Sequence, residues 1–385
     1  MAERGRRSTK KQASEQDGSA VPKTAGDAAV PAAKPATQAK PATQAKPEPP
    51  AKPAPPAKPA PPAKPAPPAK PAPGPFVCRT VTVDVPATSA NLGAGFDTLA
   101  MALDISNRIT VEVLDEPTIE LAVEGEGAAE LVADRHNRFV LALELGLRWA
   151  LGEVPAGLGW RIAMRNEIPF GRGLGSSAAA AVAGLVAADA FTGGRLGLRH
   201  QLALATELEG HPDNAAASLL GGFVAVAVID KWPEAIRFDV PRPLRAVLYV
   251  PDRVLHTTAM RAALPPEVPR ADAVFNVGRA ALAVAAIASG HYEYLRSATE
   301  DRLHQPYRAV PYPEFPELLR AAREAGALGA CLSGSGSTVI AFADSPHTID
   351  AVAAAFVAAA QQVGLSGSAQ VVAPRNAGAI VVDAR

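Results

Sequence analysis

One stretch of eleven residues decides the fold of this chain: Pro169-Phe170-Gly171-Arg172-Gly173-Leu174-Gly175-Ser176-Ser177-Ala178-Ala179. Its three alternate glycines follow a predicted strand, Arg161–Met164, and lead into an alanine-rich helix predicted over Ala178–Phe191. Glycine permits positive φ angles and lets backbone N–H groups approach an anion closely. A helix start adds unpaired N–H groups and the positive end of the helix dipole. The stretch therefore predicts a cradle for a phosphate chain, with Ser176 and Ser177 as helix caps or as ligands of a phosphate-bound metal.

This glycine stretch matches neither of the two common glycine-loop templates. It lacks the Gly-Lys-Ser/Thr ending of a P-loop. It also lacks the acidic residue that dinucleotide-binding folds place about 20 residues later, because Asp189 is too close and lies on the predicted helix. The alternative without chemistry is an ordinary strand–helix turn capped by serine.

Two other segments, Asp84–Asp97 and Gly329–Thr338, have the composition of binding loops. The first contains Asn91 and Asp97, an amide that both donates and accepts and a carboxylate that only accepts. That pair suits a polar substrate with an ammonium and a hydroxyl, and the alternative is that both side chains satisfy the backbone of a turn. The second segment predicts an N–H-rich loop between a helix and a strand, either closing over phosphate or serving as a plain turn.

Charged residues concentrate between these loops, in Thr206–Asn214. Glu207 stands among apolar residues of a predicted helix, so its carboxylate would need a partner or a metal. We expect Glu209 to be solvated. His211, Asp213 and Asn214 follow at a break marked by proline, where the histidine is either structural or part of a site.

The hydrophobic pattern of the remaining chain predicts an α+β fold without regular β-α alternation. A boundary between two halves is expected near residues 230–245, where prolines interrupt the pattern. The other predicted strands are Val77–Val85, Ile105–Val113, Thr118–Val123, Phe223–Ile229, Ala246–Val250, Thr338–Ala343, Ala369–Val372 and Ala379–Val382. The other predicted helices are Asn137–Leu151, Leu202–Glu209, Val274–Ile287, Pro316–Ala325 and Ile349–Val363.

Composition separates residues 1–75 from the remaining 310. The first segment holds 19 of the 37 prolines, no aromatic residue, and 13 Lys and Arg against 5 Asp and Glu. Such a segment cannot bury enough apolar surface to fold, so we predict a disordered tail rich in Pro, Ala and Lys. Its lysines recur at every sixth position from Lys34 to Lys70, which suits an extended polyproline rod. The tail is either a spacer or a tether to an unknown partner.

Several classes of protein are excluded by simple features. Two cysteines, Cys78 and Cys331, cannot build a disulfide framework or a zinc site. The longest apolar run, Ala178–Ala188, is too short to cross a bilayer, and no apolar segment follows the basic start of the chain. The last 310 residues carry 25 basic and 33 acidic residues, which argues against nucleic-acid binding by the folded part. We therefore expect a cytoplasmic protein without a membrane or nucleic-acid partner for its core.

In this order, the segments resemble the GHMP kinase superfamily, and within it the homoserine kinase family, from about Cys78 to the end of the chain. The glycine–serine stretch carries the resemblance to the superfamily. The form Pro-Ala-Thr-Ser-Ala-Asn-Leu-Gly-x-Gly-Phe-Asp at residues 86–97 narrows it, because galactokinases and mevalonate kinases have a Gly-Glu-His variant there. Further agreement lies in His211-x-Asp213-Asn214 before Gly221-Gly222-Phe223, in His256-Thr257-Thr258-Ala259-Met260-Arg261, and in Asp301–Arg308.

The resemblance implies a two-part GHMP kinase fold behind the tail of residues 1–75. Residues 76–240 would form the ATP-binding half, which is α/β and similar to ribosomal S5 domain 2. Residues 241–385 would form a ferredoxin-like α+β half. Because members of this family are often dimeric, the resemblance allows a homodimer, but the sequence does not give the oligomeric state.

The resemblance also implies which residues bind the ligands. Mg²⁺ would lie between Ser177 and Glu207. Asp97 suits the ammonium of L-homoserine, and Arg261 and Arg308 suit its carboxylate, because a guanidinium fork matches a carboxylate. The full set of implied L-homoserine contacts is Asn91, Asp97, His211, Asn214, Thr257, Arg261 and Arg308. The implied ATP contacts are Asn137, Pro169, Phe170, Gly171, Arg172, Gly173, Leu174, Gly175, Ser176, Ser177, Gly334 and Ser335.

The reaction implied is in-line transfer of the ATP γ-phosphate to L-homoserine, a step toward threonine. Such a transfer needs positioning and charge neutralisation more than covalent help. We assign catalysis to Ser177, Glu207, Asn214 and Arg261, with Asn214 placing the hydroxyl and Asp213 as the alternative base. Two other interpretations stay open: a GHMP kinase for another small alcohol, and a nucleotide-binding scaffold protein with a degenerate kinase body.

Overall fold

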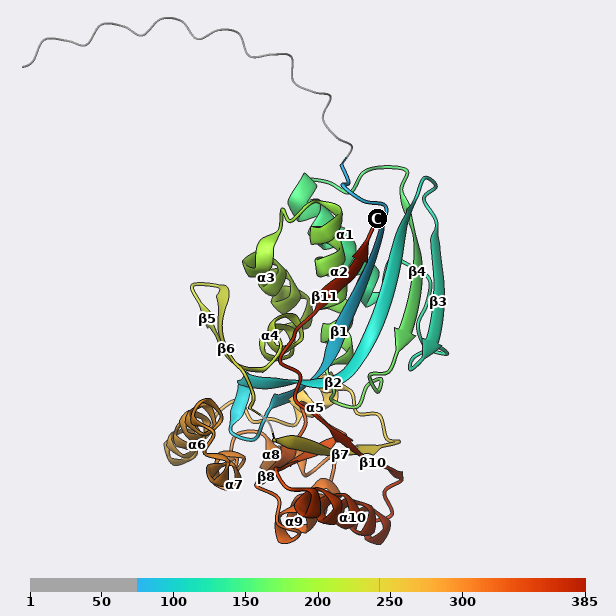
Figure 1. Ribbon diagram of the computed structural model, residues 1–385. Coiled ribbons are helices and arrows are strands. Elements are labelled where there is room, and N and C mark those ends of the chain that lie inside the picture. The colour runs from blue at the N-terminus through green and yellow to red at the C-terminus, as the bar shows by residue number, and fades with distance from the viewer. Residues whose placement is uncertain (1–74, 242) are drawn as a thin grey trace, which may run out of the picture. The chain divides into compact units, whose positions relative to one another are not determined.

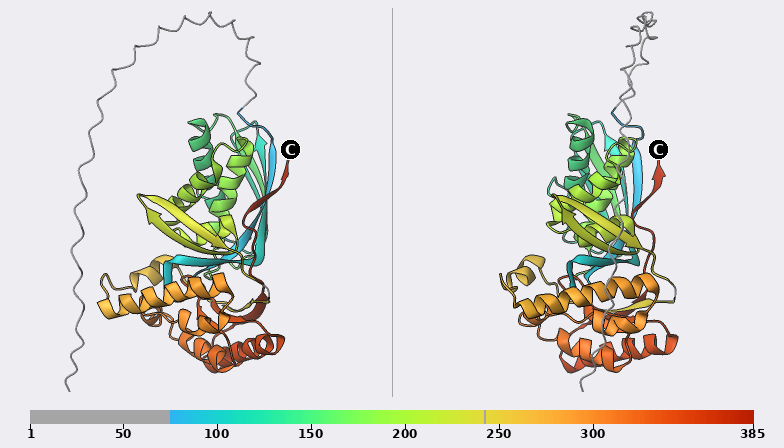
Figure 2. Two further views of the ribbon diagram at one scale, coloured as in Figure 1. Left: turned by 60° about the vertical axis from the view of Figure 1, so that its left-hand side comes forward. Right: turned by 90° about the vertical axis from the view of Figure 1, so that its left-hand side faces the viewer.

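A computed structural model describes residues 75–241 and 243–385 of the chain. The predicted tail, apart from Pro75, lies outside the described residues. Within the described ranges the chain forms two β-sheets, each with helices on a face, as Figures 1 and 2 show. This confirms the predicted α+β class.

The first sheet has seven strands, with β11-β1-β2-β4-β3 as its path and β5 and β6 branching from β2. Its strands show the alternation of a half-buried sheet: in β4, Trp160, Ile162 and Met164 are buried, whereas Arg161 and Arg165 are exposed. The strands are β1 (Thr80–Asn91), β2 (Gly95–Leu114), β3 (Ile119–Gly125), β4 (Gly159–Asn166), β5 (Phe223–Ile229), β6 (Trp232–Phe238) and β11 (Ile380–Ala384).

Four helices cover one face of this sheet: α1 (Arg138–Leu151), α2 (Ser176–Phe191), α3 (Gly197–Glu209) and α4 (Asp213–Leu220). The alanine-rich sequence of α2 lets it lie in the middle of the layer. A Cβ atom on Gly184 would lie 2.4 Å from the Phe139 carbonyl oxygen of α1, so the two helices approach as closely as their backbones permit. This packing fixes the start of α2, where the glycine stretch ends.

The second sheet has the order β10-β7-β9-β8, and all its neighbouring strands are antiparallel. With helices between β7 and β8 and between β9 and β10, this is the β-α-β-β-α-β topology of ferredoxin-like domains, as expected. Alternate residues of β7 serve two cores: Val247 and Tyr249 face α9 and α10, while Ala246 and Leu248 face the core of the first sheet. The elements are β7 (Arg245–Pro251), β8 (Gly329–Leu332), β9 (Val339–Ala343), β10 (Gly367–Val372), α9 (Phe315–Glu324) and α10 (Pro346–Gln362).

Further helical elements lie between β7 and α9 in the chain. They are α5 (Thr257–Ala262), α6 (Arg270–Ser289), a 3₁₀ turn (Tyr292–Tyr294), α7 (Leu295–Ala298) and α8 (Gln305–Arg308). In the described part of the chain, only α6 has the length and mean hydropathy, 1.5, of a membrane span. One such helix is weak evidence for a membrane, and α6 also carries Asp272, Asn276 and Arg279.

The structure differs from the prediction mainly where sheet pairing overrides composition. Strand β1 continues to Asn91, beyond the predicted end at Val85, because β2 pairs with it along that whole length. Strand β6 was missed, because Pro233 argued against a strand; it lies at a sheet edge, where proline is tolerated. Strand β8 and helices α4 and α5 were also not predicted.

Candidate active site

Several segments that are distant in sequence meet around one cavity of about 250 Å³. They are the glycine stretch before α2, the β1–β2 turn, the break between α3 and α4, and the region of α5, α8 and the β8–β9 turn. Most of the predicted site residues line it: Asn91, Asp97, Phe170, Gly171, Arg172, Gly173, Gly175, Ser176, Ser177, His211, Asn214, Thr257, Arg261, Arg308, Gly334 and Ser335. Glu209, Asp213 and the segment Val254–His256 line it as well.

The glycine stretch is bent into its shape by positive φ angles at Gly171, Gly173 and Gly175. A Cβ atom on Gly173 would lie 2.4 Å from the Ser333 carbonyl oxygen, and one on Gly175 would lie 2.0 Å from Thr88 Oγ1. Side chains are therefore excluded at both positions by space as well as by φ. The stretch leads directly into the first turn of α2, whose N–H groups have no partner within the helix. This part of the cavity has the properties of an anion site.

Arg172 braces the glycine stretch from outside. Its Nε donates to the carbonyl oxygen of Pro251 at 2.8 Å, and its Nη1 donates to that of Phe170 at 3.2 Å. These bonds tie the stretch to the end of β7. The guanidinium predicted as an ATP contact is thus already engaged with backbone carbonyl groups.

Glu209, rather than Glu207, is the acidic residue next to Ser177. Ser177 Oγ donates to Glu209 Oε1 at 2.8 Å, and the Glu209 side chain is only 8% exposed. Glu207 is exposed and faces a separate hollow beside Trp149 and Trp232. The sequence prediction for these two residues was wrong, because α3 rotates Glu209 toward the cavity and Glu207 away from the core.

The β1–β2 and β8–β9 turns are hydrogen-bonded to each other. Asn91, which has a φ angle of 69°, donates through Nδ2 to the Gly334 carbonyl oxygen at 2.9 Å. Its Oδ1 accepts from the backbone N–H of Asp97 at 3.0 Å. Asn91 therefore fits both alternatives from the sequence: its amide bonds to the backbone of the turns, and it also lines the cavity.

Asp97 and Arg261 form a two-pronged ion pair across the cavity. Arg261 Nη1 and Nη2 donate to the two Asp97 oxygens at 3.0 and 2.6 Å. The hydrogen bond to Asp97 raises the pKa of Arg261, even though burial acts in the opposite direction. The two groups expected to hold opposite ends of a zwitterion thus neutralise each other in the structure.

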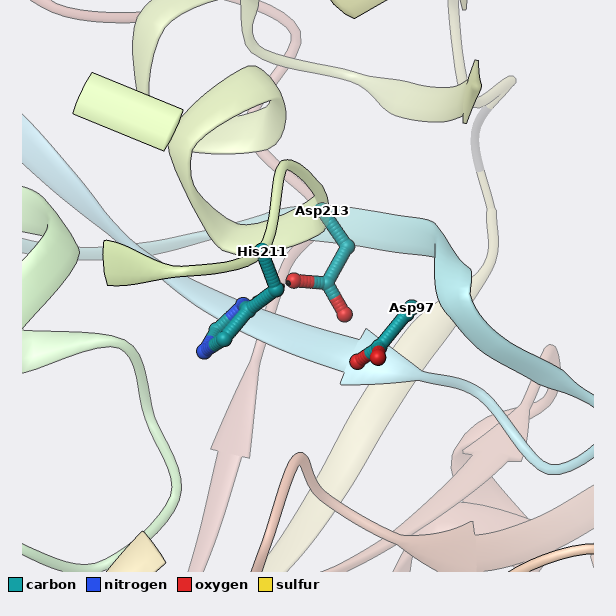
Figure 3. A group of neighbouring side chains, drawn as sticks. All are labelled: Asp97, His211 and Asp213. Carbon is teal, nitrogen blue, oxygen red and sulfur yellow. Dashed lines mark hydrogen bonds and ion pairs between the residues drawn. The ribbon is translucent and has the colours of Figure 1, made fainter. Parts of the chain in front are cut away.

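His211 and Asp213 form a second pair close to Asp97 (Figure 3). His211 Nδ1 lies 2.6 Å from Asp213 Oδ1, and since the carboxylate only accepts, Nδ1 carries the proton. Burial lowers the pKa of His211, but the hydrogen bond and charge of Asp213 more than offset it, so that pKa is raised. Potential metal-binding atoms of Asp97, His211 and Asp213 lie within 4.8 Å of one another. The Asp97 carboxylate in this group is already paired with Arg261.

Asn214 is oriented by a residue that the sequence analysis did not select. Thr88 Oγ1 donates to Asn214 Oδ1 at 2.7 Å, and Thr88 is fully buried in β1. The backbone N–H of Asn214 is held by Asp213 Oδ1 at 2.8 Å. Since the amide oxygen accepts from Thr88, we infer that the amide nitrogen, which can only donate, is the end left for a ligand.

Arg308 is a buried cation in the cavity wall, with 1% of its surface exposed. Burial lowers its pKa to about 10, with the nearby Arg261 acting in the same direction. Its Nη1 donates to the Gly334 carbonyl oxygen at 2.8 Å. A charge in this position favours an anionic group of a ligand.

Four predicted site residues do not line the cavity: Asn137, Pro169, Leu174 and Glu207. Asn137 caps α1, because its Oδ1 accepts from the Phe139 N–H at 3.0 Å. Leu174 is fully buried in the core below the glycine stretch. The residues that sequence reasoning missed are Thr88, Glu209 and Ser333. Thr88 and Ser333 did stand inside segments that the sequence marked as loops.

Comparison with known proteins gives consistent matches over the described part of the chain. The family model of the GHMP kinases N terminal domain matches residues 137–222, and that of the GHMP kinases C terminal domain matches residues 283–362. The chain is similar to the homoserine kinase of Moorella thermoacetica, with 43% identity over 306 residues that cover 78% of this chain and 99% of the relative. It is similar to a homoserine kinase of Thermus thermophilus, with 47% identity over 67% of this chain and 85% of the relative. Among solved structures, homoserine kinase from Cytophaga hutchinsonii matches with a TM-score of 0.71 and 28% identity, covering 80% of this chain and 98% of that one.

Proposed function

The chain belongs to the homoserine kinase family of the GHMP kinases, and from that premise we propose how its cavity holds the two substrates. The enzyme transfers the γ-phosphoryl group of ATP to the hydroxyl of L-homoserine, which yields O-phospho-L-homoserine on the route to threonine. One observation carries the site assignment: an anion cradle at the start of α2 shares a cavity with the Asp97–Arg261 pair and the buried Arg308.

ATP lies with its phosphates along Gly171–Ser177. This proposal is supported by the positive φ angles of the three glycines and by the free N–H groups of the first turn of α2. Ser335, which shares a hydrogen bond of 3.1 Å with Thr257, lies in the same cavity wall. The Asp97–Arg308 side of the cavity is left for the second substrate.

Ser177 and Glu209 are the residues that would hold Mg²⁺. Their oxygens lie 2.8 Å apart at the start of α2, next to the glycine stretch. Mg²⁺ prefers oxygen ligands and is commonly held by one or two carboxylates together with substrate phosphates, so this pair fits it. When bound, the ion supplies neutralisation of the charge that develops on the transferred phosphoryl group.

L-homoserine binds as a zwitterion across the Asp97–Arg261 pair. Its ammonium adds to Asp97, and its carboxylate adds to Arg308 and Arg261, so each charge of the substrate meets side chains of opposite sign. His211, with its Nδ1–H held by Asp213, donates from Nε2 to a substrate oxygen. Asn214 donates from its amide nitrogen to the reacting hydroxyl, because Thr88 holds the amide oxygen.

The transfer proceeds in line without a dedicated protein base. Asp213 is 1% exposed and its Oδ1 already accepts from His211 Nδ1 and from the Asn214 N–H. We therefore assign Asp213 the orientation of those two residues. Phosphoryl transfer through a loose transition state depends mainly on alignment and charge stabilisation, which this site provides.

The division of the folded chain into residues 76–240 and 241–385 remains a proposal. The separate family matches at 137–222 and 283–362 support it. Strand β11 crosses this division: by sequence it lies in the second range, but it pairs with β1 in the first sheet. The cytoplasmic location, the homodimer and the spacer role of the tail stay predictions.

A coupled ADP-release assay with homoserine, mevalonate, shikimate and galactose tests the function. We expect turnover with homoserine far above that with the other three alcohols. Turnover with another alcohol alone would indicate a different GHMP kinase. ATP binding without turnover on any of the four would indicate a degenerate kinase body.

A further inference from the structure

His304 lies between the β1–β2 turn and Arg308, two parts of the cavity wall that we assign to the amino-acid substrate. It does not line the cavity itself. It is the residue before α8 and is fully buried. Its Nε2 lies 2.7 Å from the carbonyl oxygen of Gly93, in the turn between Asn91 and Asp97. Its Nδ1 lies 3.1 Å from Arg308 Nη1. One imidazole ring thus contacts both the turn that carries Asp97 and the arginine that faces the ligand.

The hydrogen-bonding partners assign the proton on this ring. A carbonyl oxygen only accepts, so Nε2 carries the proton that it donates to Gly93. A guanidinium only donates, so Nδ1 has no proton and accepts from Arg308. His304 is therefore neutral. Burial lowers its pKa to about 4, and the charged groups that act on it are Asp301, Arg308 and Asp97.

Asp301 does not compete with these two bonds. Its Oδ2 lies 3.6 Å from His304 Nε2, beyond hydrogen-bonding range, and accepts from the backbone N–H groups of His304 and Gln305. Its Oδ1 accepts from the Leu303 N–H and from Asn276 Nδ2. Asp301 fixes the start of α8, whereas His304 points from that start toward the cavity.

The bonds of Arg308 show which of its nitrogens is left for a ligand. Nη1 donates both to the Gly334 carbonyl oxygen and to His304 Nδ1, which uses both of its hydrogens. Nε is buried and has no hydrogen-bond partner within residues 75–241 and 243–385. Nη2 is not among the buried atoms that lack a partner, so it is the nitrogen a ligand can reach. His304 thus holds Arg308 with Nη2 left to donate to a carboxylate.

The Gly93 turn depends on the same ring. The Phe96 ring stacks on His304 with centroids 5.3 Å apart, and the guanidinium groups of Arg261 and Arg308 each lie 5.5 Å from the centre of Phe96. The turn has no room to shift toward α7, because a Cβ atom on Gly93 would lie 2.4 Å from the Thr299 carbonyl oxygen. His304 therefore links the positions of Asp97, Arg261 and Arg308.

We propose that His304 is a positioning residue which sets carboxylate selectivity, by holding Arg308 so that Nη2 donates to the substrate carboxylate and by fixing the Gly93 turn. The proposal rests on the proposed binding of L-homoserine. It predicts that His304 matters for a substrate with a carboxylate and little for the same alcohol without one. 3-Aminopropan-1-ol is that alcohol, because it keeps the hydroxyl and the ammonium of homoserine.

The two hydrogen bonds can be removed one at a time. In His304→Gln the amide nitrogen can replace Nε2 and keep the bond to Gly93, whereas the acceptor for Arg308 is lost. In His304→Asn the amide oxygen can replace Nδ1 and keep the bond to Arg308, whereas the bond to Gly93 is lost. These variants form a matched pair of similar size and polarity.

The measurement is kcat/KM for homoserine and for 3-aminopropan-1-ol, with KM for ATP and the melting temperature as controls. We expect His304→Gln to lower kcat/KM for homoserine by about 10- to 100-fold, the usual effect of a lost hydrogen bond to a charged group. The value for 3-aminopropan-1-ol should change by less than about threefold, so the ratio between the two substrates falls. His304→Asn should retain most of the ratio.

Each outcome decides a different point. Equal losses for both substrates in His304→Gln would show a merely structural role and overturn the proposal. In an Arg308→Ala background, His304→Gln should leave the substrate ratio unchanged, and a further fall would also overturn it. If the variants do not fold, ¹⁵N NMR of the wild-type imidazole tests the Nε2–H tautomer, and the opposite tautomer contradicts the proposal. A wild-type enzyme without turnover on homoserine would instead reject the proposed function.

Discussion

The two halves of the cavity, which we assign to phosphate and to the amino-acid substrate, are built by different means. The phosphate half consists of backbone N–H groups from one continuous segment, Gly171–Ser177, and the first turn of the helix that follows. The amino-acid half consists of charged side chains from the β1–β2 turn, the α3–α4 break, α5 and α8. A ligand contact made by backbone needs only the right local φ angles. A contact made by side chains from four segments needs the whole tertiary structure to place them.

This difference predicts that single substitutions will have their largest effect at the proposed Mg²⁺ site. Glu209→Gln should lower kcat by about 10²- to 10³-fold, because it removes the carboxylate next to Ser177. It should also raise the Mg²⁺ concentration needed for half-maximal rate. The matched control is Glu207→Gln two residues earlier on α3, where the side chain is exposed and faces another hollow. Wild-type kinetics for Glu209→Gln together with a loss in Glu207→Gln would reverse this assignment.

The amino-acid half should respond separately from the phosphate half. Arg261→Ala should raise KM for homoserine by about 10- to 100-fold, since it removes a charged hydrogen-bond donor and leaves Asp97 unpaired. KM for ATP should change little. Arg302→Ala is a suitable control, because that side chain is half exposed and pairs with Asp272 outside the cavity. An equal rise in both KM values would show that the two halves are not independent.

A smaller effect is expected on the pH dependence of the amino-acid half. The pKa of His211 is raised by Asp213 despite burial, so its imidazolium persists to higher pH than for a free histidine. If this imidazolium donates to substrate, kcat/KM for homoserine falls as pH rises through that pKa. Asp213→Asn removes the raising partner and leaves the burial, so the alkaline limb of the pH profile should move to lower pH. If the alkaline limb of the kcat/KM profile does not shift in Asp213→Asn, the role given to His211 is contradicted.

The smallest effect is expected at Asn137, which the sequence placed at ATP and the structure places at the cap of α1. Asn137→Ala should lower the free energy of unfolding by about 1 kcal/mol, because the Phe139 N–H loses its acceptor. KM for ATP should remain at its wild-type value. Asn137→Ser, which retains a capping oxygen, should restore the melting temperature. A tenfold change in KM for ATP without loss of stability would instead support the sequence prediction that Asn137 contacts ATP.

The contrast between the halves also explains how much the sequence could predict. The glycine stretch, the helix after it and the loop character around Asn91 and Asp97 were predictable, because φ preferences and polar composition are local properties. Glu209 was not, since the choice between Glu207 and Glu209 depends on how α3 packs on its neighbours. Thr88 was not singled out either, because the strand that carries it is specified by pairing with β2 and not by its own small polar residues. The pairing of Asp97 with Arg261, 164 positions apart, lies beyond any local pattern.

Strand β11 has a consequence for the synthesis of this protein. It pairs with β1, and the Arg385 carbonyl oxygen accepts from the N–H groups of Arg79 and Thr80 at 2.8 Å. During synthesis on the ribosome, the edge of β1 that pairs with β11 stays uncovered until almost the whole folded chain has been translated. During that interval β1 offers an open strand edge, which is the kind of surface that pairs wrongly with other chains. The part of β1 that β11 covers, Val81–Asp84, comes before Thr88 and Asn91, so this late step protects the nascent chain at a place outside the cavity.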